Sequence, residues 1–150
     1  MIQGVVISQL KRYDDERGWL AEFWRTDESG YQPKMGYVSF TKFGVVRGPH
    51  EHIKQSDYFV FIGPGNFELH LWDRRENSAT KGEYQKIQVG ENNPASVIVP
   101  PGVVHGYKSI SAVGSYSINL ADELWRGEGK KREVDEVRWE KKENSEYKII

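Results

Sequence analysis

Short runs of apolar or alternating residues recur along this chain, and each run ends at a cluster of glycine, proline, asparagine or aspartate. Runs of this length that end at turn residues are typical of β-strands rather than helices. The pattern therefore predicts an all-β fold of sequential antiparallel strands. The clearest strands are expected at residues 58–62, 67–72, 84–89, 95–99 and 116–120.

Two glycine-containing turns punctuate these strands. The sequence GPGN at residues 63–66 predicts a hairpin between the first two strands, and GENNP at residues 90–94 separates the third from the fourth. Glycine is suited to such turns because it adopts positive φ without steric cost. From residue 122 the chain is dense in charge and has few apolar anchors. We expect this segment to wrap the domain as irregular structure or a short helix, with the basic run at residues 130–132 facing solvent.

Length and composition narrow the function. A chain of 150 residues fits one domain, expected to span residues 1–150. The absence of cysteine excludes disulfides and cysteine nucleophiles and suits a reducing compartment, while a formal net charge of −1 argues against a general nucleic-acid binder. No apolar stretch reaches the length of a signal peptide or membrane span. We therefore expect a cytoplasmic protein that binds neither nucleic acid nor membrane.

Three of the four histidines lie in two short segments, and this concentration is the strongest functional signal. His50 and His52 stand in GVVRGPHEH at residues 44–52, and His105 ends PPGVVH at residues 100–105. A single histidine beside a turn is more often a surface or core residue. Three in paired motifs indicate a site.

The two histidine segments resemble the paired motifs of cupins, whose fold is a jelly-roll, or double-stranded β-helix, barrel. In that fold the segments lie on neighbouring strands. The resemblance implies that the three histidines converge at the mouth of a small barrel, where ligands are commonly held. Either Asp57 or Ser56 would take the position of the cupin carboxylate.

Four longer stretches resemble the dTDP-4-dehydrorhamnose 3,5-epimerases in the family's own order: DERGWLAE at 15–22, VRGPH at 46–50, DRRENSATKG at 73–82 and VPPGVVHGY at 99–107. The chain is similar to a shorter archaeal and bacterial group in which two histidines stand where the family has one. The resemblance implies an isomerase that acts on a nucleotide-linked, dTDP-type 4-keto-6-deoxy sugar in deoxysugar or cell-surface polysaccharide biosynthesis. It also implies a cofactor-independent homodimer joined through its N-terminal strands.

The same resemblance assigns roles to individual residues. His50 becomes the base that removes a proton beside the sugar ketone, and His105 a second histidine in the pocket. Arg47 matches the arginine at the diphosphate, while Arg17 and Glu22 match nucleotide-binding positions that the neighbouring subunit supplies in family dimers. The chemistry agrees, because imidazole exchanges protons near neutral pH and arginine presents a fork of donors to phosphate.

The chain also departs from the family. The family's pocket lysine falls near Tyr58, so that Lys54 or His52 could replace it, and the aspartate that partners the base falls beyond residue 150, which leaves Asp57 or Glu51 for that task. The family's catalytic tyrosine falls on Ile118, and Tyr116 shares its strand face. The expected catalytic residues are His50, His105, Tyr116 and Asp57, and the expected substrate-binding residues are Arg17, Glu22, Arg47, His52, Lys54, Tyr58, Arg75 and Tyr107.

Two other functions fit the same residues. His50, His52 and His105 could hold a divalent metal ion in a metal-dependent cupin enzyme. The missing lysine and aspartate would also suit a binding protein for sugar nucleotides that has no catalytic activity. We expect no obligatory metal, because the resemblance is to enzymes that work by proton transfer alone.

Overall fold

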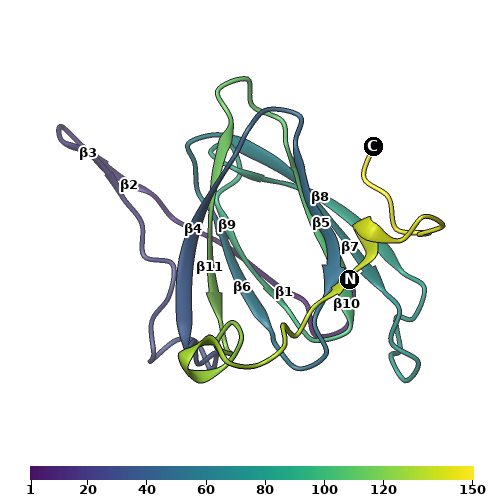
Figure 1. Cartoon of the computed structure of the whole chain (residues 1–150). Coiled ribbons are helices and arrows are strands. Elements are labelled where there is room, and N and C mark those ends of the chain that lie inside the picture. The colour runs from purple at the N-terminus through teal and green to yellow at the C-terminus, as the bar shows by residue number, and fades with distance from the viewer.

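Two antiparallel five-stranded sheets face each other in the computed structural model, which describes residues 1–150 (Figure 1). The first sheet has the order β1 (Val6–Gln9), β9 (Ala95–Val99), β6 (Asp57–Phe61), β11 (Ser115–Ala121), β4 (Met35–Thr41). The second has the order β12 (Val137–Arg138), β5 (Val46–Glu51), β10 (Val103–Ser109), β7 (Asn66–Asp73), β8 (Tyr84–Gly90). The predicted all-β class is confirmed.

The five predicted strands all form, but the hairpin expected at residues 63–66 is wrong. β6 pairs with β9 and β11, whereas β7 pairs with β10 and β8, so this turn carries the chain from one sheet to the other. The positive φ values of Gly63 and Gly65 still serve the turn. The glycines therefore predicted correctly that the chain turns at residues 63–66, but they did not predict which strands β6 and β7 pair with.

The core fills the space between the sheets, and strand alternation decides which side chains enter it. On β6, Phe59 and Phe61 point inward and are almost completely buried. They meet Phe67 of β7 and Tyr107 of β10 with ring centroids 5.4–5.7 Å apart across the two sheets. Neighbouring strand residues point to the opposite face, so Tyr58 lies on the outside of the same sheet.

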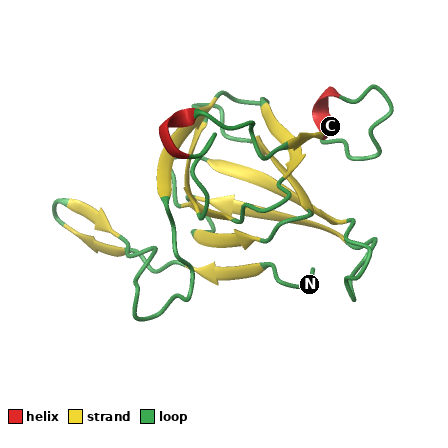
Figure 2. Ribbon diagram, turned by 60° about the horizontal axis from the view of Figure 1, so that its bottom comes forward, coloured by secondary structure: helices red, strands yellow, loops and turns green.

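The C-terminal segment is irregular, as expected, with two short 3₁₀ helices, Glu128–Lys130 and Trp139–Lys141, as the only helical elements (Figure 2). It also contains β12, which pairs with the edge of β5 so that Arg138 lies opposite His50. The segment is thereby fixed beside the histidine motif. No helix in the structure is long and apolar enough to cross a membrane.

A small hairpin stands away from the barrel near the N-terminus. Its strands β2 (Tyr13–Asp15) and β3 (Gly18–Leu20) pair only with each other and extend outward from the two main sheets (Figure 1). Trp19 and Leu20 remain 43% and 62% exposed on it. Two large apolar side chains are therefore exposed close together on this projecting element.

Candidate active site

A cavity of about 1220 Å³ lies between the two sheets. Its walls come from β4 of the first sheet, β5 and β10 of the second, and the C-terminal segment between residues 123 and 140. The side chains that carry polar chemistry into it include Tyr37, Arg47, His50, His52, Lys54 and Glu136. Both sheets and the C-terminal segment are thus needed to form this cavity.

The histidine motif enters the cavity through strand alternation. His50 and His52 are two residues apart on β5 and the loop after it, so both point to the inside while Glu51 points away. His105 lies directly across from His50 in the β5–β10 ladder. The rings of His50 and His105 are 4.5 Å apart, and those of His50 and His52 are 5.3 Å apart. The three histidines therefore converge, as the paired motifs implied.

Asp57 occupies the carboxylate position that the sequence left open between Asp57 and Ser56. Its Oδ2 atom lies 3.1 Å from Nε2 of His52 and 3.1 Å from Nε2 of His105, and its Oδ1 atom accepts hydrogen bonds from Gln55 and Asn119. Burial would raise the pKa of Asp57, but its contacts with the two histidines hold that pKa well below its usual range. Asp57 is therefore a buried anion.

His52 is the cationic histidine of the site. Its Nδ1–H donates to the carbonyl oxygen of Asp135, which leaves Nε2 facing Asp57. Burial alone would lower the pKa of His52, but the contact with the Asp57 carboxylate outweighs it and raises the pKa to about 9. His52 consequently carries a positive charge at neutral pH.

The pKa of His50 is shifted in the opposite direction to that of His52. Burial, reinforced by its histidine neighbours His105 and His52, lowers the pKa of His50 well below 6.5. Its Nδ1 atom lies 3.7 Å from a carboxylate oxygen of Glu136, so Nε2 is the nitrogen that remains for a substrate. Glu51, the alternative partner for the base, instead accepts hydrogen bonds from Arg74 and Trp139. The imidazole of His50 is therefore neutral at neutral pH and has a nitrogen free to accept a proton.

Charged side chains of both signs line the rest of the cavity. Its carboxylates are Glu123, Glu133, Asp135, Glu136 and Glu140, and its cations other than the paired Arg138 are Arg47, Lys54, Arg126, Lys130 and Arg132. None of these cations forms an ion pair with a carboxylate of the chain. The basic run at residues 130–132 is exposed, as expected, and Lys130 and Arg132 also border the cavity. Unpaired cations around a cavity suit an anionic ligand such as a diphosphate.

Three expected site residues lie outside the cavity. Tyr116 and Tyr58 are on the outer face of the first sheet, where Tyr116 packs on Phe40 and the hydroxyl of Tyr58 donates to the carbonyl of Phe23. Both alternate with inward-facing neighbours, which is why they cannot reach the histidines. Arg75 forms an ion pair with Asp73 at the end of β7. The placement of Tyr58, Tyr116 and Arg75 in the pocket is thus corrected.

Arg17 and Glu22 also lie away from the cavity of their own chain. Arg17 is at the turn of the projecting hairpin, where its side chain is 83% exposed and pairs with Asp15. Glu22 follows the hairpin and pairs with Arg25. A position so remote is compatible with a role at another subunit's cavity.

Three residues of the site were not predicted from the sequence. Tyr37 reaches the cavity from β4 and Glu136 from the C-terminal segment, while Asn119 of β11 is buried and donates to Asp57. Alternation along β4 and β11 was a usable signal for Tyr37 and Asn119. Nothing in the sequence indicated that the charged C-terminal segment would lie against His50.

The same cluster could hold a metal ion. His50, His52, Asp57 and His105 each offer one ligand atom, and these four atoms lie within 4.8 Å of one another. Asp57 Oδ2 and His105 Nε2 are buried without an aligned hydrogen-bond partner. Imidazole and carboxylate ligands of this kind suit zinc or another divalent transition metal.

Comparison with known proteins points to sugar metabolism. The model of the family described as dTDP-4-dehydrorhamnose 3,5-epimerase matches residues 1–142. The chain is 40% identical over 110 residues to the spore coat polysaccharide biosynthesis protein SpsL of Bacillus subtilis, covering 72% of each chain. It is 36% identical over 127 residues to the probable low-salt glycan biosynthesis epimerase Agl13 of Haloferax volcanii, covering 83% of this chain and 81% of that relative.

A solved structure supports the fold independently. The dTDP sugar isomerase of Desulfovibrio desulfuricans G20 superposes with a TM-score of 0.80 at 22% sequence identity. The match covers 91% of this chain and 84% of that one. The shared fold confirms the predicted cupin barrel.

Proposed function

The chain belongs to the dTDP-4-dehydrorhamnose 3,5-epimerase family, and we propose that it epimerises a dTDP-linked 4-keto-6-deoxy sugar by removing a proton from a carbon next to the ketone. Its relatives in spore coat polysaccharide and glycan biosynthesis support a role in building cell-surface carbohydrate. The absence of cysteine suits a cytoplasmic location.

The observation that carries this proposal is the opposite charge state of two histidines that share one cavity. His50 is neutral and can accept a proton through Nε2, whereas His52 is held cationic by Asp57. Proton removal beside a ketone moves an electron pair into the carbonyl and places negative charge on its oxygen. A cation fixed near that oxygen stabilises the enolate, which is the task of the lysine that this chain lacks.

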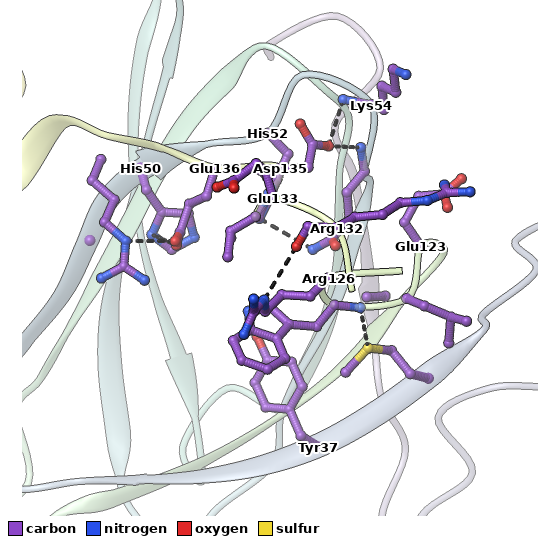
Figure 3. Close-up of a pocket in the computed structure, with 18 of the residues that line it drawn as sticks. Tyr37, His50, His52, Lys54, Glu123, Arg126, Arg132, Glu133, Asp135 and Glu136 are labelled. Carbon is purple, nitrogen blue, oxygen red and sulfur yellow. Dashed lines mark hydrogen bonds and ion pairs between the residues drawn. The ribbon is translucent and has the colours of Figure 1, made fainter. Parts of the chain in front are cut away.

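The diphosphate of the substrate has suitable partners at the cavity wall. Arg47 is held in place because its Nε and one terminal nitrogen donate to Thr41 and to the carbonyl of Phe40, both at 2.8 Å. The other terminal nitrogen makes no hydrogen bond within the chain. Lys54 also borders the cavity and forms no ion pair within the chain, although its side chain extends away from the histidines (Figure 3). We assign the diphosphate to this end of the cavity, because arginine pairs with phosphate oxygens through a fork of donors.

We also propose a homodimer in which the hairpin of β2 and β3 reaches the partner. The hairpin exposes Trp19 and Leu20, and Arg17 at its tip is too remote to serve its own cavity. The outer face of β4 adds the exposed apolar side chains of Val38 and Phe40. Symmetric dimers commonly bury such a surface against its copy. Arg17 and Glu22 would then contact the nucleotide bound in the partner subunit.

Solvent exchange tests the reaction. The protein is incubated in D2O with a dTDP-linked 4-keto-6-deoxyhexose, and the sugar protons are followed by NMR. The expected result is loss of the proton signal at a carbon next to the ketone, with appearance of the inverted sugar. Binding of the sugar without exchange would instead favour a binding protein.

A metal-dependent enzyme is the second candidate, favoured by the convergence of His50, His52, Asp57 and His105. The Nε2 atoms of His52 and His105 both lie 3.1 Å from Oδ2 of Asp57. This arrangement fits residues that bind a metal ion as well as residues that share protons with one another. Metal content and activity after chelation separate the two candidates.

A further inference from the structure

We propose that a zinc ion binds reversibly among three histidines and one aspartate of the cavity, and that it inhibits the proposed reaction while it is bound. The four ligands are His50, His52, Asp57 and His105. This inference rests on the proposed epimerase function and describes how the same site is regulated. It differs from the metal-dependent candidate, in which the ion supports turnover.

Two of the histidine rings are held in the orientation that metal ligands adopt. Nδ1 of His52 is bound to the backbone carbonyl oxygen of Asp135, and Nδ1 of His105 lies 3.0 Å from the carbonyl oxygen of Val103. Each ring therefore turns its Nε2 atom to Asp57. Histidines that bind metals usually donate their second ring N–H to a backbone carbonyl or a carboxylate, which fixes the ring.

The other two ligands have similar support behind them. Nδ1 of His50 lies 3.7 Å from a carboxylate oxygen of Glu136, and the two side chains lie side by side at the cavity wall (Figure 3). Oδ1 of Asp57 accepts hydrogen bonds from Gln55 at 2.8 Å and from Asn119 at 2.7 Å, so Oδ2 is the oxygen left for an ion. Such outer contacts orient the ligands before the metal arrives.

The distances within the cluster are close to those of a zinc site. Oδ2 of Asp57 lies 3.1 Å from Nε2 of His52 and 3.1 Å from Nε2 of His105. Neighbouring ligand atoms of a tetrahedral zinc ion are about 3.3 Å apart, given bonds of about 2.0–2.1 Å. The four ligand atoms all lie within 4.8 Å of one another, and Asp57 Oδ2 and His105 Nε2 are buried without an aligned hydrogen-bond partner. A central ion would satisfy both atoms.

The composition of the chain points zinc to this cluster. The chain has no cysteine and only four histidines, three of which are in the cluster. The fourth, His70, is on β7, where its Nδ1 atom lies 2.8 Å from the hydroxyl of Tyr84. Imidazole ligands suit zinc, whereas Mg²⁺ prefers a shell of oxygen atoms. The cluster should therefore bind zinc and not magnesium.

Inhibition follows from the number of lone pairs that the histidines offer. A neutral imidazole has one lone pair in the plane of its ring, and this pair binds either a proton or a metal ion. His50 with zinc bound cannot accept the proton of the sugar. His52 becomes a ligand only after it releases the proton on Nε2 to solvent, so the cation beside the enolate is lost as well. Zinc binding and the proposed reaction are thus mutually exclusive.

The ion has a route to the cluster from the cavity. The side chains of His50 and His52 are 17% and 10% exposed and line the cavity, while those of His105 and Asp57 are buried behind them. Zinc would therefore meet the base first. A sugar in the cavity would cover the same route, because the proposed reaction places it against His50.

Zinc binding is measured first on protein without substrate. Calorimetry should give one zinc ion per chain, and Co²⁺ in its place should give the visible absorption of a four-coordinate ion. In D2O with a dTDP-linked 4-keto-6-deoxyhexose, exchange should fall in proportion to the fraction of chains that hold zinc. Because the diphosphate of the substrate also binds zinc, the rate is plotted against free zinc. A chelator should restore the rate, and the same concentration of Mg²⁺ should not reduce it.

His105→Asn removes one ligand and leaves the base in place. Its affinity for zinc, and the sensitivity of its remaining exchange to zinc, should both fall by at least ~10–100-fold, because loss of a group behind a ligand already costs that much. His70→Asn is the matched control, since it removes the histidine outside the cluster and should change neither value. Equal zinc affinity in the wild type and His105→Asn would place the ion elsewhere and overturn the inference.

Two further results would overturn it. One is a wild-type protein that binds no zinc at millimolar concentration, and the other is an exchange rate that stays constant or rises as zinc fills the cluster. If the zinc-free wild type shows no exchange with any keto sugar, the proposed function fails instead. The calorimetric and Co²⁺ measurements still judge the zinc site in that case, so the two failures are distinguishable.

Discussion

Nε2 of His52 lies 3.1 Å from Oδ2 of Asp57, and this contact makes His52 a cation two residues from the neutral His50. A base and an electrophile thus come from one short motif, placed on the same side of β5 by strand alternation. The cost of burying the carboxylate is offset because Oδ1 accepts hydrogen bonds from Gln55 and Asn119 and Oδ2 lies 3.1 Å from Nε2 of His52 and of His105. In the proposed reaction, the second histidine of the motif would supply the cation in place of the family's lysine.

The pH dependence of exchange follows from these two pKa shifts. The pKa of His50 is depressed, so the base remains unprotonated at pH 6.5 and the acidic fall in rate should lie below that value. The pKa of His52 is raised to about 9, so the stabilising cation should be lost, and the rate should fall again, as the pH rises through about 9. His52→Gln should abolish the alkaline fall and retain the acidic one. A wild-type rate that rises between pH 6.5 and 8 would contradict the assignment of His50.

Arg47→Ala should weaken binding of dTDP-linked sugars without unfolding the protein. Loss of a hydrogen bond to a charged group costs about 1.5–3 kcal/mol, which is roughly 10- to 150-fold in affinity. Titration calorimetry with dTDP measures the change, with Lys86→Ala as the control because Lys86 pairs with Glu68 away from the cavity. Equal affinity in wild type and Arg47→Ala would place the diphosphate elsewhere.

The projecting hairpin should hold the dimer together. Light scattering should give twice the chain mass for the wild type and a monomer for Leu20→Asp, because a charge would then be buried in the apolar contact. Arg17→Ala should leave the dimer intact and still weaken dTDP binding, since the arginine would act across the interface. A wild-type monomer at working concentration would exclude this arrangement.

Removal of metal should leave the reaction intact. We expect protein treated with a chelator, then dialysed, to exchange and invert the sugar at the rate of untreated protein, because proton transfer between His50 and the sugar needs no metal. Elemental analysis of untreated protein should give much less than one metal ion per subunit. A stoichiometric ion whose removal abolishes turnover would make His50, His52, Asp57 and His105 ligands instead.

The sequence was sufficient to predict the strands and the convergence of the histidines. The strand at residues 95–99 coincides with β9, and the spacing of His50 and His52 places both on one strand face. Both are local properties, set by side-chain periodicity and turn residues. Strand pairing is not local, which is why the turn at residues 63–66 was wrongly read as a hairpin when it crosses between the sheets.

The site residues that were wrongly predicted also depended on structure that is not local in the sequence. The resemblance placed the family's lysine near Tyr58 and its tyrosine at Ile118, which shares a strand face with Tyr116. Tyr58 and Tyr116 are each adjacent to a residue that points inward, and alternation then places both outside. Once Asp57 is accepted as the pocket carboxylate, Tyr58 is excluded, so part of this signal was present in the sequence. The position of Glu136 could not be predicted in this way. The segment around it shows no periodic pattern of apolar residues, and it is held in place by the pairing of β12 with β5.

The most direct test of the proposed chemistry is deuterium exchange by His50→Asn. Asparagine keeps similar bulk and some hydrogen bonding but has no basic nitrogen, so we expect dTDP affinity and thermal unfolding to be unchanged while exchange falls by ~10²–10⁴. His105→Asn should lose less, because Nδ1 of His105 is bound to the carbonyl of Val103 and its Nε2 faces Asp57 rather than the cavity centre. Exchange at the wild-type rate in His50→Asn would show that His50 is not the base.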